Sequence, residues 1–338
     1  IDRFHRGALG AAEEELRELE SMGYRCAETA LYLGHCALAS DRLVEALRRY
    51  REARSRGPDR PEVWVGLAIV AARRLHFRRA IRHLRRALRI QPALQEAYDN
   101  LILCHAALGE TRPARLAFRR SVALDANSPH PYYNVGFLHF DEGDPARARE
   151  MWTRVLELQA DYPDAARLVA SCDRVLGNLA AARTRLEELL GREPRNIEAL
   201  SDLGLVHEDR DEWQSAVKAY ERLLEIDPAQ SRVRARLGVL IYRNGHGPEG
   251  LRHLRRAAEQ DPSDPDIAEP LAYALLESGA RKEALAAARV PVRTQRRSAP
   301  ALAARARIHA TVGQLERAAA DYRRAWRLEP GEAEHARA

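Results

Sequence analysis

Lysine is almost absent from this chain of 338 residues, although positive charge is plentiful. Only Lys218 and Lys282 are lysines among 55 basic residues, so the other 53 are arginines, set against 49 acidic residues. Arginine is therefore the ordinary cation of the sequence. A single arginine at one position is weak evidence for a special role.

Long apolar runs and the sequence signals of export or chemistry are also missing. No apolar run approaches 18 residues, so no transmembrane helix is expected, and residues 1–6 do not form a secretory signal. No Cys-x-x-Cys, His-x-x-x-His, Ser/His/Asp or paired-carboxylate pattern stands out. Such patterns normally carry metal binding or catalysis. We therefore expect a non-enzymatic protein with no cofactor and no bound metal.

The sequence does contain a repeat of 34 residues. Nine units align without a gap when the first begins at Ala27. Position 15 of the unit is glycine in six units, and position 32 is proline in six. Position 20 is small in all nine: Ala46, Ala80, Ala114, Ala148, Ala182, Ala216, Gly250, Ala284 and Ala318. Chance does not give this agreement, so the chain is a repeat array.

Each unit is predicted to fold as a hairpin of two helices. Apolar residues recur at helical spacing at unit positions 4, 7, 8 and 11 and again at 20, 24, 27 and 30. Glycine between the two sets supplies a turn, and proline after the second set ends the helix. One hairpin cannot bury its apolar face alone, so the hairpins must stack. The predicted fold class is all-α, an α-solenoid of stacked helix-turn-helix repeats.

The pattern resembles the tetratricopeptide repeat (TPR) family, whose repeat has the same length. Asp125–Gly143 reads DANSPHPYYNVGFLHFDEG, and Ala216–Pro228 reads AVKAYERLLEIDP. The resemblance covers Ala27–Glu332. It implies a right-handed superhelix in which the first helix of each hairpin, helix A, lines a concave groove and the second, helix B, faces outward.

This register divides the chain into three parts. Residues 1–26 are expected to be the C-terminal part of a truncated repeat, residues 27–332 nine tandem repeats, and residues 333–338 the start of a further helix. Neither end reads as a polar capping repeat, so we expect the chain to be a segment of a longer repeat protein. The nine repeats are 27–60, 61–94, 95–128, 129–162, 163–196, 197–230, 231–264, 265–298, which is degenerate, and 299–332.

The degenerate repeat carries two prolines inside its predicted helices. Pro270 lies at unit position 6, and Pro291 lies within helix B. A proline inside a helix removes a hydrogen bond and costs about 3 kcal/mol. We therefore predict a shortened helix B that ends near Val290, followed by an irregular connection over residues 291–300. A decayed repeat is favoured over a functional hinge.

Three further patterns are better explained by the fold than by a functional site. Residues 245–250 read G-x-G-x-x-G, but a dinucleotide site needs a preceding strand, and this string falls in a turn between helices. The remaining two patterns follow the repeat: Cys36, Cys104 and Cys172 share position 10, and His105, His139, His207 and His309 share position 11. Both sets are expected to be core residues, too far apart to form disulfides or a metal site.

The predicted groove changes character along the array. Asn100 and Asn134 are expected to hydrogen-bond a passing peptide, and Phe137 and Phe140 to supply the apolar contacts. Partial burial between neighbouring helices is the alternative interpretation. Later repeats present a charged wall suited to a polar partner. The candidate partner-binding residues are Val65, Ile69, Asn100, Leu103, Tyr133, Asn134, Phe137, Phe140, Arg167, Arg174, Arg236 and Arg243.

Net charge also differs strongly between repeats. Residues 61–94 hold eight arginines and one acid, a net charge of +7, whereas residues 197–230 hold three basic and nine acidic residues, a net charge of −6. A basic stripe can bind nucleic acid or an acidic membrane. This one lacks interleaved aromatic residues, so we favour a solvated outer face and expect no nucleic-acid partner.

These observations favour a protein–protein interaction scaffold, or adaptor, that holds a partner protein or peptide in the groove. Two alternatives stay open: the substrate-recruiting arm of a larger, glycosyltransferase-like enzyme, and a scaffold of bacterial envelope, pilus or polarity machinery. Alanine and arginine usage suggests a GC-rich bacterial source. Unpaired buried thiols suit the cytoplasm, with the periplasm as the alternative. The oligomeric state is left open.

Overall fold

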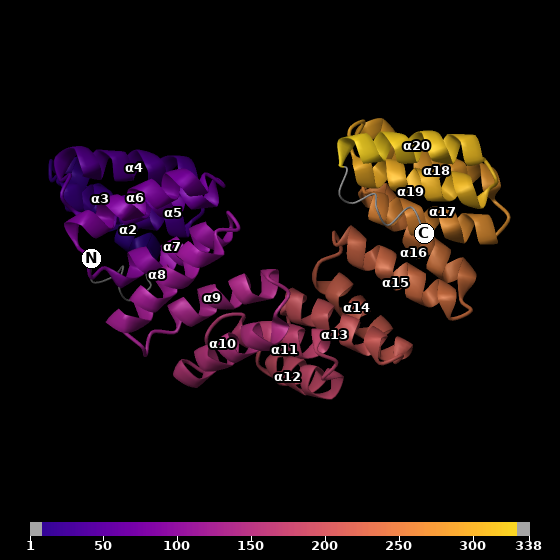
Figure 1. The fold of residues 1–338 in the computed structure, drawn as a ribbon, viewed down its shortest axis with the longest axis horizontal. Helices are drawn as coiled ribbons and strands as arrows, with labels where there is room; N and C mark the ends of the chain where they lie inside the picture. The colour runs from indigo at the N-terminus through magenta and orange to yellow at the C-terminus, as the bar shows by residue number, and fades with distance from the viewer. Residues whose placement is uncertain (1–8, 330–338) are drawn as a thin grey trace. The chain divides into compact units, whose positions relative to one another are not determined.

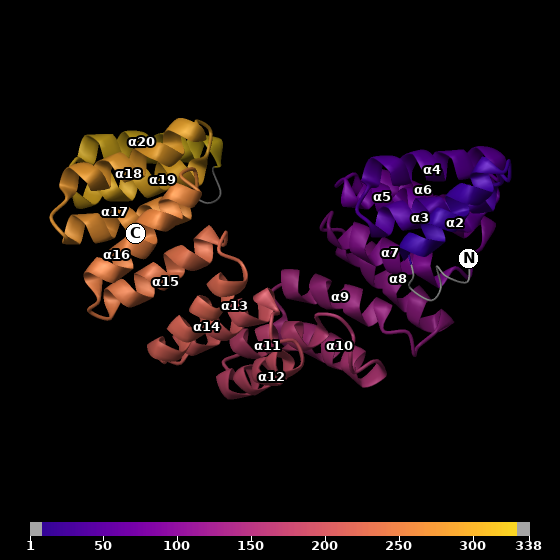
Figure 2. The ribbon, with the colours of Figure 1, turned by 180° about the vertical axis from the view of Figure 1, so that it is seen from behind.

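The computed structural model describes residues 9–329, and every regular element within them is a helix. The chain divides into two units, residues 1–176 and 177–338. The predicted helix that begins at residue 333 lies outside the described residues. Successive helices of each unit lie side by side (Figure 1), as the opposite view also shows (Figure 2).

The helices of the first unit are α2 (Leu9–Ser21), α3 (Ala27–Ala39), α4 (Leu43–Arg56), α5 (Pro61–Arg73), α6 (Phe77–Ile90), α7 (Gln95–Ala106), α8 (Thr111–Leu124), α9 (His130–Asp141), α10 (Pro145–Leu158) and α11 (Ala165–Val175). Those of the second are α12 (Leu179–Arg192), α13 (Ile197–Asp209), α14 (Trp213–Ile226), α15 (Ser231–Arg243), α16 (Gly247–Gln260), α17 (Pro265–Glu277), α18 (Arg281–Thr294), α19 (Ala299–Thr311) and α20 (Leu315–Leu328).

The helices pair as hairpins that stack in chain order. In the first unit α3 packs on α4, α5 on α6, α7 on α8 and α9 on α10; in the second α13 packs on α14, α15 on α16, α17 on α18 and α19 on α20. The A helix of one hairpin also packs on the A helix of the next, as α7 does on α9 and α15 on α17. The all-α solenoid predicted from the sequence is thereby confirmed.

Matched side-chain sizes explain why unit position 8 is small. Tyr50, at position 24, is fully buried, and a Cβ atom added to Gly34 would lie 2.7 Å from its ring. Trp152 and Tyr220 stand in the same way against Gly136 and Gly204. A large side chain on helix B thus fills the space that glycine leaves on helix A, which sets how closely the two helices pack.

A single side-chain donor at unit position 4 fastens each of several A helices to the loop before it. Trp64 donates its indole N–H to the carbonyl of Pro58 at 2.9 Å, and Tyr98 donates its hydroxyl to that of Pro92 at 3.1 Å. Arg234 makes the same bond with a guanidinium, to the carbonyl oxygen of Pro228 at 2.9 Å. The equivalent bond at Tyr132 reaches Ala126. The bond gives the loop carbonyl a donor from the A helix that follows it.

The predicted shortening of helix B in the degenerate repeat is wrong. α18 continues through Pro291 to Thr294, and the next helix begins at Ala299. The proline removes one helical hydrogen bond, but the helix resumes at once, because the N–H of Gln295 donates to the carbonyl of Pro291 at 2.8 Å. Pro291 and Val292 are buried, and Val292 packs with the residues of α19. This burial offsets the lost bond.

Candidate functional site

The structure places two of the predicted groove residues in the interior. Val65 is 2% exposed and belongs to the core of the first unit, so the expectation that it lines an open groove is wrong. Asn134 is 8% exposed, and its amide donates to the carbonyl oxygen of Asp99 on the preceding A helix at 3.0 Å. That amide holds α9 against α7, so its predicted role toward a passing peptide is wrong as well.

The other predicted groove residues of α5, α7 and α9 reach the surface. Leu103 is 40% exposed and Phe140 is 37% exposed, whereas Ile69, Asn100, Tyr133 and Phe137 are half-buried. The amide of Asn100 donates to the carbonyl of Glu96 in its own helix at 2.8 Å. Within residues 9–329, this amide makes no bond to a neighbouring helix like the one that Asn134 makes to Asp99.

Aromatic rings support one another on the exposed side of α9. The ring centroid of Phe137 lies 5.1 Å from that of the buried Trp152 and 5.2 Å from that of Tyr133, both edge to face. Phe140 lies 6.0 Å from Trp152. Phe137 thus combines a packing role with partial exposure, and Phe140 is the more accessible of the two phenylalanines.

The four predicted arginines fall in different units. Arg167 and Arg174 lie on α11 in the first unit, where Arg167 is 3.7 Å from Asp164. Arg236 and Arg243 lie on α15 in the second unit, and both are exposed. Arg236 borders one hollow beside α15, and Arg243 borders both that hollow and a larger one.

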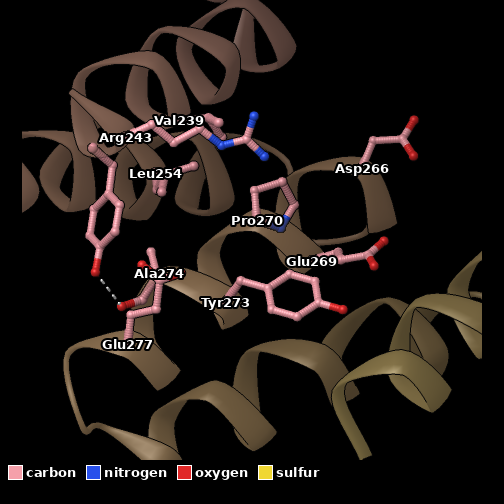
Figure 3. Close-up of a pocket in the computed structure, with 10 residues that line it drawn as sticks. Val239, Arg243, Leu254, Asp266, Glu269, Pro270, Tyr273, Ala274 and Glu277 are labelled. Atoms are coloured by element: carbon pink, nitrogen blue, oxygen red, sulfur yellow. Dashed lines mark hydrogen bonds between the residues drawn. The ribbon is translucent and has the colours of Figure 1, made fainter. Parts of the chain in front are cut away.

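The larger hollow lies between α15, α16 and α17 and has a volume of about 560 Å³ (Figure 3). A second hollow of about 500 Å³ shares four of its lining residues and extends the surface to Glu208 on α13. We call the two together the α15–α17 trough. Its lining residues are Glu208, Arg232, Ala235, Arg236, Val239, Leu240, Tyr242, Arg243, Leu254, Asp266, Glu269, Pro270, Tyr273, Ala274 and Glu277.

Most acidic groups of the trough already have a cationic partner. Glu269 binds the guanidinium of Arg307 through both carboxylate oxygens, at 2.5 and 2.6 Å, which raises the pKa of that arginine. Asp266 lies 3.4 Å from Arg232, and Glu208 lies 3.6 Å from Arg236. These pairs neutralise three of the four acidic side chains of the trough, and the fourth, Glu277, has no cationic partner among the described residues.

Arg243 differs from the other cations of the trough. Within residues 9–329, no carboxylate lies within ion-pair distance of its guanidinium, which belongs to both hollows. Figure 3 shows Arg243, Pro270 and Tyr273 around the same space. Next to Arg243 on α15, Tyr242 donates its hydroxyl to the carbonyl of Ala274 at 3.1 Å, and burial raises the pKa of this tyrosine. The trough thus offers one cation beside apolar and aromatic walls.

Sequence reasoning missed Tyr242, Pro270 and Tyr273 as site residues. Tyr273 stands at unit position 9, as the predicted groove residues Leu103 and Phe137 do, and Tyr242 stands at position 12, as Phe140 does. The signal was therefore present. Pro270 was noticed only as a helix breaker.

The buried histidines and the cysteines have structural roles. His105, His207 and His309 are 5 to 8% exposed, and each ring Nδ1 bonds a side chain five residues later, in the turn to helix B. All four cysteines lie in the described part of the chain and none forms a disulfide. Across residues 9–329 there is no group of three His, Cys, Asp or Glu side chains able to hold a metal ion. Those residues also include no helix with the length and apolarity that a bilayer crossing requires.

Comparison with known proteins places this geometry in a family. Tetratricopeptide repeat family models match residues 173–231 and 207–268. PilW, described as a widely conserved type IV pilus biogenesis factor, is 18% identical over 61% of this chain and 96% of its own, with a TM-score of 0.56. A tetratricopeptide repeat protein from Parabacteroides merdae is 15% identical over 78% of this chain and 99% of its own, with a TM-score of 0.54.

A longer relative extends the comparison. The APC/C hetero-tetramer Cut9–Hcn1 gives a TM-score of 0.54 at 18% identity, and the match covers 80% of this chain but only 47% of that one. At such identities the structures share a fold and nothing more specific. The family matches, the stacked hairpins and the 34-residue register agree with one another. The chain is a tetratricopeptide repeat protein.

Proposed function

We propose that the chain is a non-enzymatic interaction scaffold and that the α15–α17 trough of its second unit holds an extended segment of a partner protein. The observation that carries the proposal is the trough itself, which runs over successive A helices and is lined by Arg243, Tyr242 and Tyr273. A cleft with apolar walls and a few polar groups is the usual form of a binding site.

The chemistry of the walls favours a particular kind of segment. Three of the four wall acids, Glu208, Asp266 and Glu269, are paired with arginines and so do not select a basic peptide. Arg243 is the group left to engage a carboxylate, and an arginine can do so through two hydrogen bonds. The tyrosines and Pro270 suit an apolar or aromatic side chain beside that carboxylate. The expected segment is therefore extended, apolar and acidic.

Pro270 adds a backbone feature to the site. Because proline has no N–H, the carbonyl of Asp266 lacks the donor that a helix normally provides four residues later. A peptide laid along α17 has an N–H group to offer at each non-proline residue. We infer that the partner supplies the missing donor.

A peptide selection tests this function. Linear peptides displayed on phage are selected against the whole chain, and the enriched peptides are synthesised and titrated by calorimetry. We expect apolar peptides with an acidic residue, with at least tenfold weaker binding to Arg243→Glu and to Tyr273→Ala. The control is Arg252→Glu, an exposed arginine on α16 outside the trough, which should bind within twofold of the original chain.

Two results would overturn the proposal. One is that no peptide is enriched over selection on an unrelated protein. The other is that enriched peptides bind the two trough variants as well as they bind the unmodified chain. If Phe140→Ala then abolishes binding, the exposed aromatic side of α9 in the first unit, with Leu103 and Phe137, is the binding surface instead.

A further inference from the structure

The turn between α5 and α6 contains a residue whose type does not suit its backbone. Leu75 has a φ of 59°, in the left-handed region, and is 76% exposed to solvent. Left-handed φ is costly for a side chain with a Cβ atom and is tolerated best by Gly, Asn and Asp. The equivalent turns obey that rule, with Asp41 (φ 55°), Asp211 (φ 59°) and glycine at Gly109, Gly143, Gly177, Gly245, Gly279 and Gly313.

Leu75 therefore holds an apolar side chain in water at a cost in backbone strain. Nothing in the packing of the first unit requires it, because most of the residue is exposed. Strain of this kind persists at sites where the strained residue does something other than stabilise the fold.

Arginines surround this leucine. Arg73, Arg74, Arg78 and Arg79 are all exposed. Arg73 binds Asp41 at 2.9 Å, but the described residues place no carboxylate within ion-pair distance of the other three. We call residues 73–79 the Leu75 turn. Its repeat, residues 61–94, has a net charge of +7.

The positive charge of nearby arginines also contributes to a lowered histidine pKa within the same repeat. The pKa of His83 on α6 is lowered to about 4, first by burial and then by Arg79, Arg54 and Arg82. Arg54 and Arg86 lie over the indole of Trp64 at 5.7 and 6.0 Å. The arginines of α4 and α6 thus form one positively charged surface, and the aromatic ring within it is already occupied.

A small hollow lies directly beside the Leu75 turn. It has a volume of about 210 Å³, with an apolar floor and a polar rim. The floor is formed by Leu47, Leu67, Val70 and Ala71, and the rim by Arg74, His76, Arg79 and His83. An exposed leucine, arginines without acidic partners and a hollow with a basic rim therefore meet at one edge of the first unit.

We propose that the Leu75 turn docks on the surface of an anionic lipid bilayer, with Leu75 inserted among the headgroups and Arg74, Arg78 and Arg79 on their phosphates. A peripheral contact of this kind combines an apolar side chain at the headgroup boundary with cations that face anionic lipids. It is independent of the α15–α17 trough, which lies in the other unit.

Other polyanions fit the observations less well. Single-stranded nucleic acid needs free aromatic rings for its bases to stack on, and the ring of Trp64 already has the guanidinium groups of Arg54 and Arg86 over it. A nucleic-acid duplex or an acidic protein segment would use the arginines but would leave the strained, exposed leucine without a role. A bilayer uses both features.

Sedimentation with vesicles tests the proposal on the whole chain. One set of vesicles contains equal amounts of phosphatidylglycerol and phosphatidylcholine, and the other contains phosphatidylcholine alone. We expect binding to the first set only, weakened by salt. Arg74→Gln with Arg79→Gln should reduce the affinity about fivefold for each arginine. The matched control, Arg252→Gln with Arg256→Gln on α16, should leave it within twofold.

Leu75→Asn separates binding from folding. Asparagine suits a left-handed φ, so this variant should unfold at the same temperature as the original chain or a higher one. Loss of the apolar side chain should nevertheless weaken vesicle binding about tenfold.

The proposal is overturned if the chain ignores anionic vesicles, or if Leu75→Asn binds them as tightly as the original. It is also overturned if a DNA duplex or polyglutamate competes the vesicles off and binds Leu75→Asn unchanged, because the surface would then recognise charge alone.

Discussion

Asn134 and Pro270 occupy the same position, the sixth, in two repeats, yet they leave the faces of their A helices in different states. Asn134 on α9 donates to the carbonyl of Asp99, and this bond joins α9 to the preceding A helix. The residue equivalent to Asp99 in the later pair is Ala235, which lines the trough together with Pro270. A proline side chain has no donor for that carbonyl.

The comparison shows how one repeat frame yields both a closed face and an open one. In the first unit a buried amide bridges neighbouring A helices. In the second unit the bridging donor is missing and a hollow of about 500 Å³ lies between the equivalent residues. The residue at position 6 therefore helps to decide whether neighbouring A helices close against each other or leave a hollow.

Replacing Pro270 by asparagine is expected to have the largest effect. The helix regains a hydrogen bond, and the amide can bridge to the carbonyl of Ala235, so the free energy of unfolding should rise by about 3 kcal/mol. The trough should narrow, and selected peptides should bind at least tenfold less tightly. Urea unfolding and calorimetry measure the two quantities.

Pro270→Ala is the control for this change. Alanine restores the helical N–H, which takes the Asp266 carbonyl away from the partner, but it brings no bridging amide. It should therefore stabilise the chain and weaken peptide binding only about threefold. Equal affinity of the asparagine and alanine variants would show that position 6 does not close the face.

Acidification should sharpen the difference between the two units by weakening the first. Burial lowers the pKa of both His35 and His83 to about 4, against about 6.5 when unfolded. Both histidines are neutral in the fold and take up protons on unfolding, so stability is fully present above pH 6.5 and falls as the pH drops toward 4. At pH 5 the loss should be about 2 kcal/mol from His35, with a smaller contribution from the more exposed His83.

Hydrogen exchange of the intact chain at pH 7 and pH 5 locates this loss. After correction for the intrinsic rate, protection should fall in α3 to α6 before it falls in α15 to α18. His35→Gln should reduce the pH dependence, and the idea fails if protection declines equally in both regions.

Removing the bridging amide is expected to have the smallest effect. Asn134→Ala deletes a buried hydrogen bond, and the free energy of unfolding should drop by about 1 kcal/mol. Asn100→Ala is the matched control, since that amide bonds only within its own helix in the described structure, and its loss should change stability by less than about 0.5 kcal/mol. Chemical unfolding of the two variants side by side decides the point.

The sequence predicts the hairpins well because their causes are local. A glycine at position 8 and an aromatic residue at position 24, such as Gly136 and Trp152, lie in one hairpin and reveal each other by size. The hydrogen bond that holds the Asn134 side chain in the interior is made to a carbonyl 35 residues earlier. The position of that carbonyl is set by the packing of two A helices. Periodicity contains no such information, so Asn134 was misread as a binding group.

The prediction that helix B ends before Pro291 failed for a related reason. Pro291 does remove a helical hydrogen bond, as expected, but the tertiary burial of Pro291 and Val292 outweighs this cost. Local preference is overridden where a neighbouring helix supplies enough contact. The trough residues Tyr242 and Tyr273 were predictable from the register, whereas the opening between them was not.

The donor at unit position 4 has a consequence for how these hairpins can be exchanged. An indole at Trp64, a phenol at Tyr98 and a guanidinium at Arg234 all reach the carbonyl six residues earlier. If the segment that is moved begins before this loop, it contains both the donor and the acceptor. A transplanted hairpin therefore keeps the hydrogen bond that holds its A helix to the loop. When hairpins of this array are recombined, the segments should therefore be joined before the proline that precedes each A helix. Any long side chain with a hydrogen-bond donor at position 4 can then make the bond to the loop carbonyl.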